Sequence, residues 1–293
     1  MALRSRFLIG GFVGLLGLKK QQEAPSYVLI GGGTASYYAA LTIRAYDPNS
    51  KVLMISADNE APYNRPPLSK ELWLHGTKNV DKNLEYIGVT GKKRDIKYES
   101  DGFYLSPTDL NKFEHGGVSL LRNTHVTQID PVNKEVTLDT GKKVKYEKLL
   151  IATGGKPKIP YPFYSPHLRN KVMTYNNASD FQKLYRIAHE SSAILIYGNS
   201  ATAAELAFSV QTKFGKDKLK IIHVFPEQYP MQESLPPNVG EFVRNAISEK
   251  GVIIESRTQP TFVNQLPNGQ VEVELEKDGE KHKLKKLAYA SIL

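Results

Sequence analysis

The feature that most constrains this sequence is a pattern of strand, tight turn, helix and strand that occurs twice. The first copy is YVLIGGGTASYYAALTIRAYDPNSKVLMISAD at 27–58, and the second, which begins AILIYGNSATAAELA, covers 193–227. Each copy has two short apolar runs of strand length around a helical stretch, which is typical of a βαβ unit with parallel strands. We therefore predict an α/β protein with two Rossmann-like units.

The turn of the first copy fits the nucleotide-binding pattern G-x-G-x-x-G with a serine in the third place. Gly31 permits a sharp turn, Gly33 lets the backbone approach a pyrophosphate, and Ser36 is small enough for the helix to pack on the strand. The first N–H groups of the helix predicted at 36–46 are suited to bind phosphate oxygens. The pattern with its flanking strands predicts nucleotide binding, and a glycine-rich turn without a ligand is the alternative.

An acidic residue is expected at the end of the second strand, where it would bind ribose hydroxyls. Ala57 stands at that place and Asp58 follows one residue later, so Asp58 is the candidate after a loop adjustment.

The second copy departs further from the glycine pattern. Gly198 keeps the first glycine, while Ser200 and Ala203 stand in the second and third places. Ser200 puts a side chain where the backbone must come closest to a pyrophosphate. Glu227 ends the next strand and is the natural ribose-binding acid. We therefore expect weakened NAD(H) binding.

Composition excludes several kinds of chemistry. The chain contains no cysteine, which excludes thiolate zinc sites, cysteine nucleophiles and a redox-active dithiol. Redox chemistry would therefore need a bound cofactor, and no metal site is predicted. The net charge of +9 favours anionic partners in general, but the sequence has no nucleic-acid module signature. Non-specific electrostatic binding of DNA through the basic surface is the remaining nucleic-acid hypothesis.

Residues 1–23 are predicted to be a leader, which would serve either as a targeting segment or as a membrane anchor. An apolar run at 7–18 lies between basic residues and is too short for an ordinary membrane span. The absence of acidic residues before Glu23 favours a mitochondrial presequence, with a secretory signal or a packed helix as alternatives. Membrane association is expected through 7–18.

Two domains are expected after the leader. A first nucleotide-binding domain is predicted at 24–157 and a second at 158–293, with a linker at 156–168 that contains four prolines. In the first domain, Ser69 is predicted to cap the helix that follows APYNRPPLSKELW at 61–73.

Three strings together resemble the FAD-dependent pyridine-nucleotide oxidoreductases: IGGGTA at 30–35, PYNRPPLSKELW at 62–73 and YEKLLIATGG at 146–155. The strings FYLSPTDL at 103–110 and HGGVSLL at 115–121 are similar to those of the mitochondrial branch of this family that is associated with cell death. The similarity runs from about residue 24 to about residue 290. It implies two cofactors, FAD in the first domain and NAD(H) in the second.

The resemblance assigns roles to individual residues. It implies that Lys70 lies near the reacting edge of the flavin and pairs with Glu205, and these two are the candidate catalytic residues. The candidate cofactor-binding residues in this sequence are Gly31, Gly32, Gly33, Thr34, Ala35, Asp58, Arg65, Lys70, Val126, Thr153, Gly154, Gly198 and Glu227. Among them, Arg65 is expected on the flavin side and Val126 on the adenine side.

The sequence also departs from the family pattern. Asn176 stands where the family has an arginine that binds FAD, and Glu233 replaces a lysine near the second nucleotide. The chain ends at Leu293, before the segment that in the family returns to the FAD domain and before a C-terminal domain. We therefore expect an FAD domain that is incomplete in its C-terminal part.

The resemblance implies an oxidoreductase in which nicotinamide passes hydride to the flavin and the flavin reduces an acceptor, with a role in programmed cell death. The expected partners are NADH, an unspecified electron acceptor and a second copy in a homodimer. The expected location is the mitochondrial inner membrane or intermembrane space, with relocation to the nucleus. One alternative is a catalytically weakened binding or signalling protein that acts through protein partners or DNA. Another is a soluble reductase of the ferredoxin-reductase-like branch.

Overall fold

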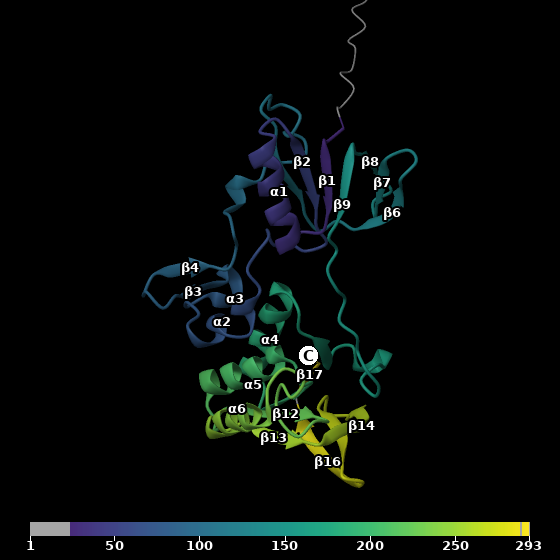
Figure 1. Ribbon diagram of the computed structural model, residues 1–293. Coiled ribbons are helices and arrows are strands. Elements are labelled where there is room, and N and C mark those ends of the chain that lie inside the picture. The colour runs from purple at the N-terminus through teal and green to yellow at the C-terminus, as the bar shows by residue number, and fades with distance from the viewer. Residues whose placement is uncertain (1–23, 288, 293) are drawn as a thin grey trace, which may run out of the picture.

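Two parallel β-sheets, one above the other in Figure 1, organise the chain. The computed structural model describes residues 24–287 and 289–292. The upper sheet has the strand order β5-β2-β1-β9. Its strands are almost wholly apolar, and β5, β2 and β1 are mostly buried, as expected of parallel strands that are covered on both faces, whereas β9 is more exposed. They are β1 (Tyr27–Ile30), β2 (Lys51–Ile55), β5 (Gly117–Leu121) and β9 (Lys148–Ile151).

Helix α1 (Thr34–Tyr46) connects β1 to β2, and an antiparallel meander connects β5 to β9. The meander packs on the sheet through Val136 and Leu138, which join Val28 and Leu53 in one buried cluster. Its strands are β6 (Val126–Asp130), β7 (Glu135–Leu138) and β8 (Lys143–Lys145).

The lower sheet repeats this arrangement. Its strand order is β10-β17-β11-β12-β13, so β13-β12-β11-β17 matches β5-β2-β1-β9 and β10 is added at the edge. The strands are β10 (Val172–Thr174), β11 (Ala193–Tyr197), β12 (Lys220–Phe225), β13 (Ile253–Ser256) and β17 (Tyr289–Ile292). The meander between β13 and β17 comprises β14 (Thr258–Gln265), β15 (Val271–Lys277) and β16 (Glu280–Leu287). The prediction of two Rossmann-like units in an α/β fold is confirmed.

Helices α4 (Ala178–Glu190), α5 (Ala201–Phe214) and α6 (Pro237–Glu249) flank the lower sheet. Helix α4 begins with a capping box, in which the Asn177 side chain accepts from the Asp180 N–H and the Asp180 carboxylate accepts from the Asn177 N–H. Helix α5 ends at Phe214, and the next residue, Gly215, has a φ of 75° in the left-handed region.

One segment of the first half of the sequence lies with the second sheet. After β2 the chain crosses to the lower part of Figure 1, forms a small body at 61–96, and returns through η2 (Asp101–Phe103) to β5. This body, here called the inserted segment, contains η1 (Pro66–Leu68), α2 (Glu71–Leu74), α3 (Val80–Asn83), β3 (Glu85–Ile87) and β4 (Lys93–Asp95).

The inserted segment is held by a shared apolar core. Trp73 is 1% exposed and packs edge-on against Phe181 of α4, with ring centroids 5.1 Å apart. Its indole N–H donates to the Leu68 carbonyl at 2.9 Å. Leu72 and Leu184 belong to the same buried cluster, so the segment buries its apolar side chains against α4 and α5 rather than against the first sheet. The predicted domains 24–157 and 158–293 remain a prediction.

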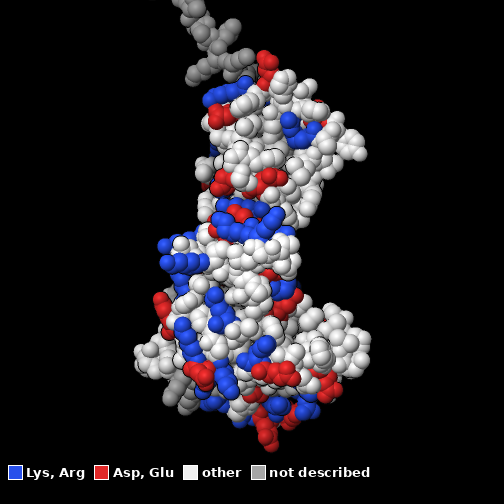
Figure 2. All heavy atoms as spheres, turned by 90° about the vertical axis from the view of Figure 1, so that its left-hand side faces the viewer, with Lys and Arg blue, Asp and Glu red and all other residues white. Residues whose placement is uncertain are grey.

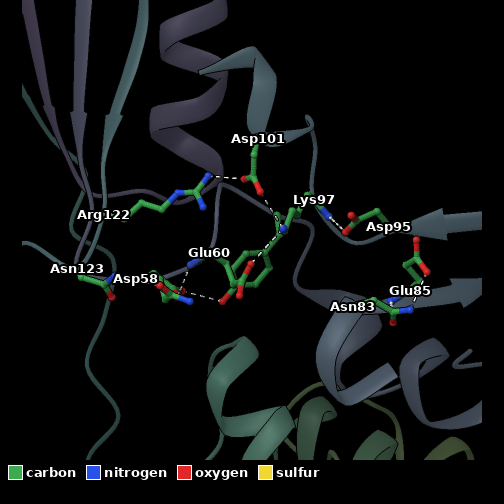
Figure 3. A network of polar contacts seen from close by, with 11 residues as sticks. Asp58, Glu60, Asn83, Glu85, Asp95, Lys97, Asp101, Arg122 and Asn123 are labelled. Carbon is green, nitrogen blue, oxygen red and sulfur yellow. Dashed lines mark hydrogen bonds and ion pairs between the residues drawn. The ribbon is translucent and has the colours of Figure 1, made fainter. Parts of the chain in front are cut away.

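A polar network lies where the chain leaves the first sheet (Figure 3). Asp101 pairs with Arg122 and lies 3.7 Å from Lys97, which in turn lies 3.3 Å from Glu60. The Lys97 and Glu60 side chains are only 18% and 17% exposed. The network therefore links the residues before the inserted segment (Glu60) and after it (Lys97 and Asp101) to Arg122, which follows β5.

The Tyr63 hydroxyl connects this network to α4. It donates to Asp58 Oδ2 at 3.0 Å and accepts from the Ala178 N–H at 3.0 Å. Burial, together with the negative charge of Asp58, raises the pKa of Tyr63 above its ordinary value.

No helix in the described ranges 24–287 and 289–292 combines the length and the apolarity needed to cross a bilayer. The predicted leader, with its membrane-associating run at 7–18, lies outside these ranges.

Tyr63→Phe is expected to lower the free energy of unfolding by about 1–3 kcal/mol, because it leaves a buried N–H without an acceptor and Asp58 Oδ2 without its donor. Tyr46→Phe is the matched control, since Tyr46 is 89% exposed. Urea unfolding followed by circular dichroism measures both. Equal midpoints for the two variants would contradict the bridging role of Tyr63.

Candidate dinucleotide-binding site

In the first glycine turn, the fold requires glycine at two positions, and the third glycine borders open space. Gly31 has a φ of 118°, and a Cβ there would lie 2.1 Å from the Ala152 carbonyl oxygen. A Cβ on Gly32 would lie 2.2 Å from Ser56 Oγ, so the packing of the sheet itself excludes side chains at both positions. A Cβ on Gly33 would meet nothing within 4 Å.

Gly33 is also the N-cap residue of α1, and no side chain caps this helix. The turn therefore leaves open space and unpaired N–H groups where a pyrophosphate would bind. These residues fit the pyrophosphate of FAD.

The other predicted residues of the first unit lie at the carboxyl edge of the sheet or beside it. Thr34 and Ala35 are exposed in the first turn of α1, and Thr153 and Gly154 are exposed just after β9. Val126 begins β6 and is half-buried. Sequence reasoning missed Tyr98, whose hydroxyl lies 3.0 Å from Thr34 Oγ1, because this contact spans 64 positions.

Asp58 is already hydrogen bonded within the chain. One carboxylate oxygen accepts from the Tyr63 hydroxyl and the other from the Glu60 N–H at 3.3 Å. Its role toward ribose remains a prediction.

The Lys70–Glu205 ion pair joins the inserted segment to α5. Lys70 Nζ lies 2.7 Å from Glu205 Oε2, and the Ser69 hydroxyl donates to the same oxygen at 2.6 Å. The two charged side chains are 36% and 33% exposed. The structure therefore brings together the two residues predicted to be catalytic.

The prediction that Ser69 caps the following helix is wrong. Helix α2 begins at Glu71, its N-cap position is Lys70, and no side chain caps it. The Ser69 hydroxyl donates instead to Glu205 and to the Pro66 carbonyl at 3.3 Å. As a cap, the hydroxyl oxygen would accept from a backbone N–H, whereas here the hydroxyl donates to a carboxylate in a charge-assisted hydrogen bond.

A cavity of about 340 Å³ opens beside the ion pair. Lys70, Glu205, Arg65 and Asn176 all line it. Arg65 donates to the Asn176 side-chain oxygen at 3.1 Å and to its carbonyl oxygen at 3.3 Å. Asn176, which replaces the expected arginine, thus faces the same cavity as Arg65.

A second cavity, of about 430 Å³, shares Tyr175 and Thr202 with the first and extends to Tyr197 and Ser200. The two form a path from the ion pair to the second glycine turn.

The second turn keeps part of a nucleotide-binding geometry. Gly198 has a φ of 139°, which favours glycine. The Ser200 side chain caps α5 by accepting from the Ala203 N–H at 3.1 Å. With glycine at this position, that N–H group would remain available to a phosphate. Glu227 follows β12, and its Oε2 atom is buried without a hydrogen-bond partner. Such an oxygen fits the hydroxyl donors of a ribose. Glu233 is exposed.

Sequence reasoning missed His223, which lies fully buried beneath this turn. Its Nε2–H donates to the Gly198 carbonyl at 2.9 Å, so the ring holds the turn from below. Burial lowers the pKa of His223 to about 4. A histidine within the apolar strand KIIHVF gives no local signal that separates this role from core packing.

Among residues 24–287 and 289–292, no group of three or more histidine or acidic side chains is placed to hold a metal ion.

The duplicated units and their two glycine turns define a protein class: α/β proteins with two dinucleotide-binding units. A family model described as pyridine nucleotide-disulphide oxidoreductase matches residues 25–291, so the chain belongs to that family. The family typically binds FAD and NAD(P)H.

Two relatives illustrate the similarity. The chain is 36% identical over 234 residues to a Drosophila melanogaster protein named putative apoptosis-inducing factor 1, mitochondrial, which covers 78% of this chain and 32% of that protein. It is 32% identical over 255 residues to apoptosis-inducing factor 1, mitochondrial, of Dictyostelium discoideum, which covers 86% of this chain and 46% of that protein. The chain thus spans less than half the length of these two relatives.

The fold resembles that of a ferredoxin reductase for the CYP199A2 system from Rhodopseudomonas palustris. The TM-score is 0.69 at 18% identity, over 92% of this chain and 58% of the other.

His223→Gln is expected to flatten the acid dependence of stability. The pKa of His223 lies below its ordinary value of 6.5 in the folded protein, so between about pH 6.5 and pH 4 only the unfolded state takes up a proton. The free energy of unfolding therefore falls as pH decreases through this window, by up to about 1.4 kcal/mol per pH unit from this group.

Urea unfolding at several pH values measures the slope, and His189→Gln, at an exposed histidine of α4, is the control. An unchanged slope in His223→Gln would contradict the assignment.

Proposed function

We propose that this protein is an FAD-dependent NAD(P)H oxidoreductase of the apoptosis-inducing-factor type. The observation that carries the proposal is the Lys70–Glu205 pair, which stands at one end of the path that leads to the second glycine turn. FAD, when bound, would accept hydride from nicotinamide and pass electrons to an acceptor.

Different residues of the chain would bind FAD and supply charge for its reduction. The open turn at Gly33 and the free N–H groups of α1 bind the FAD pyrophosphate. Lys70 supplies a fixed positive charge in the cavity, where negative charge develops during reduction. Glu205 and Ser69 hold Lys70 in place, and Arg65 borders the same cavity.

The second unit binds the nicotinamide dinucleotide along the cavity lined by Tyr197, Ser200 and Thr202, with Glu227, just after β12, as the ribose-binding acid. The unpartnered Oε2 of Glu227 supports NADH over NADPH, because a carboxylate accepts from a ribose 2′-hydroxyl and repels a 2′-phosphate. The use of the Ala203 N–H by Ser200 weakens this binding relative to an open glycine turn.

The two relatives named as mitochondrial apoptosis-inducing factors support the finer assignment. We propose a mitochondrial location and a role in programmed cell death on that basis. Relocation to the nucleus, DNA binding, membrane association and a homodimer stay predictions.

The central test is reduction of the flavin. Purified protein reconstituted with FAD is expected to show flavin absorbance that is bleached by NADH under anaerobic conditions. Lys70→Met is expected to retain FAD and to slow bleaching at least about tenfold, because a preorganised charge is lost. Lys145→Met, at an exposed lysine of the meander, is the control. Failure to bind FAD, or an unchanged rate in Lys70→Met, would contradict the proposal.

Gly33→Ala separates binding from folding. The added methyl group meets open space in the protein, so the free energy of unfolding should change by less than about 1 kcal/mol, while FAD affinity should fall at least about tenfold. Gly31→Ala should instead destabilise the fold, because its Cβ collides with the Ala152 backbone. Gly102→Ala, where the nearest atom is 4.0 Å from the added Cβ, is the control. Fluorescence titration with FAD and thermal unfolding measure the two effects. Unaltered FAD binding in Gly33→Ala would sink the placement of the pyrophosphate.

A further inference from the structure

A cleft of about 830 Å³ lies on the other side of the Lys70–Glu205 pair from the candidate dinucleotide site. Helices α5 and α6 form one wall, and α2 with the β3–β4 hairpin forms the other. Lys70 and Glu205 line both the cleft and the 340 Å³ cavity, and the rest of the lining is separate. The cleft walls are mainly apolar and aromatic, through Leu74, Tyr86, Phe208, Met231, Phe242 and Ile247.

Large apolar side chains stand exposed along this cleft. Val89 in the hairpin turn is fully exposed, and Phe242 of α6 and Ile87 of β3 are 72% and 42% exposed. Figure 2 turns this side of the molecule toward the viewer and shows uncharged surface between groups of basic side chains. A volume and lining of this kind are typical of sites for small apolar molecules.

Glu71 places a carboxylate in the wall of this mainly apolar cleft. It lines the cleft, and its Oε2 atom is buried without a hydrogen-bond partner. Lys70, the preceding residue, pairs with Glu205 rather than with Glu71. A buried carboxylate oxygen without a donor is unfavourable, so a ligand that supplies an O–H or N–H group is preferred over a purely apolar one.

We propose that this cleft binds a small aromatic molecule that carries a hydrogen-bond donor, such as a phenol or an aromatic amine. The aromatic body packs among Tyr86, Phe208 and Phe242, and the donor binds the Glu71 carboxylate, one of whose oxygens has no partner in the protein. This site shares only Lys70 and Glu205 with the dinucleotide path.

The test uses 2-naphthol and 2-methoxynaphthalene, in which a methyl group replaces the hydroxyl hydrogen and removes the donor. Titration calorimetry with the full chain is expected to show saturable binding of both, with 2-naphthol about tenfold tighter, as one hydrogen bond to a charged acceptor provides. Glu71→Met keeps the side-chain length but removes the acceptor, and should make the two affinities equal. Glu249→Gln, at an exposed acid on α6, is the control and should leave the preference intact.

Ala246→Trp fills the cleft from α6 and should weaken binding of both probes at least about tenfold. Thermal unfolding of each variant shows that it is folded. Three outcomes would overturn the proposal: no saturable binding of 2-naphthol, equal affinities in the unaltered protein, or a preference that survives Glu71→Met. Unchanged binding in a folded Ala246→Trp would place the site elsewhere and would also overturn it.

Discussion

Trp73 donates its indole N–H to the Leu68 carbonyl and packs its ring against Phe181, and this anchors the inserted segment on α4. The Tyr175 hydroxyl donates to the same carbonyl at 2.5 Å and accepts from the indole at 3.2 Å. Burial raises the pKa of Tyr175, so its hydroxyl stays a donor at physiological pH. The Trp73 backbone N–H also donates to the Lys70 carbonyl at 3.0 Å, so this buried arrangement holds the backbone at Lys70.

The Lys70–Glu205 pair depends on that anchor. Its charged atoms come from positions 135 apart in the sequence, and an ion pair that is about one-third exposed contributes little stability by itself. The apolar core under α2 supplies the energy, and the ion pair supplies the orientation of one charge in a cavity. The catalytic candidates thus rest on packing that contains no charge.

Features carried by local sequence could be predicted. Strands β1 and β11 lie at the starts of the two predicted units, and α1 begins only two residues before its predicted start, because Gly33 can serve as the N-cap. These elements depend on apolar runs and glycines that lie next to each other in the chain. The partnership of Lys70 with Glu205 was predicted only through a family resemblance, since no pattern of spacing links two such distant residues.

Features that depend on distant partners could not be predicted. Ser69 has the sequence context of a helix cap, but folding offers it a carboxylate 136 positions away. His223 and Tyr98 act through contacts with backbone or side chains in other elements. The cleft beside Glu71 arises from the inserted segment facing α5 and α6. Nothing in the order of residues announces that arrangement.

The course of the chain ties its two sheets together. The inserted segment belongs by sequence to the half that contains β1, yet its core side chains belong to the half that contains β11. A protease that cut the proline-rich linker at 156–168 would therefore not release two compact domains. The fragments would stay associated through Trp73 and its neighbours, or each would expose half of a shared core.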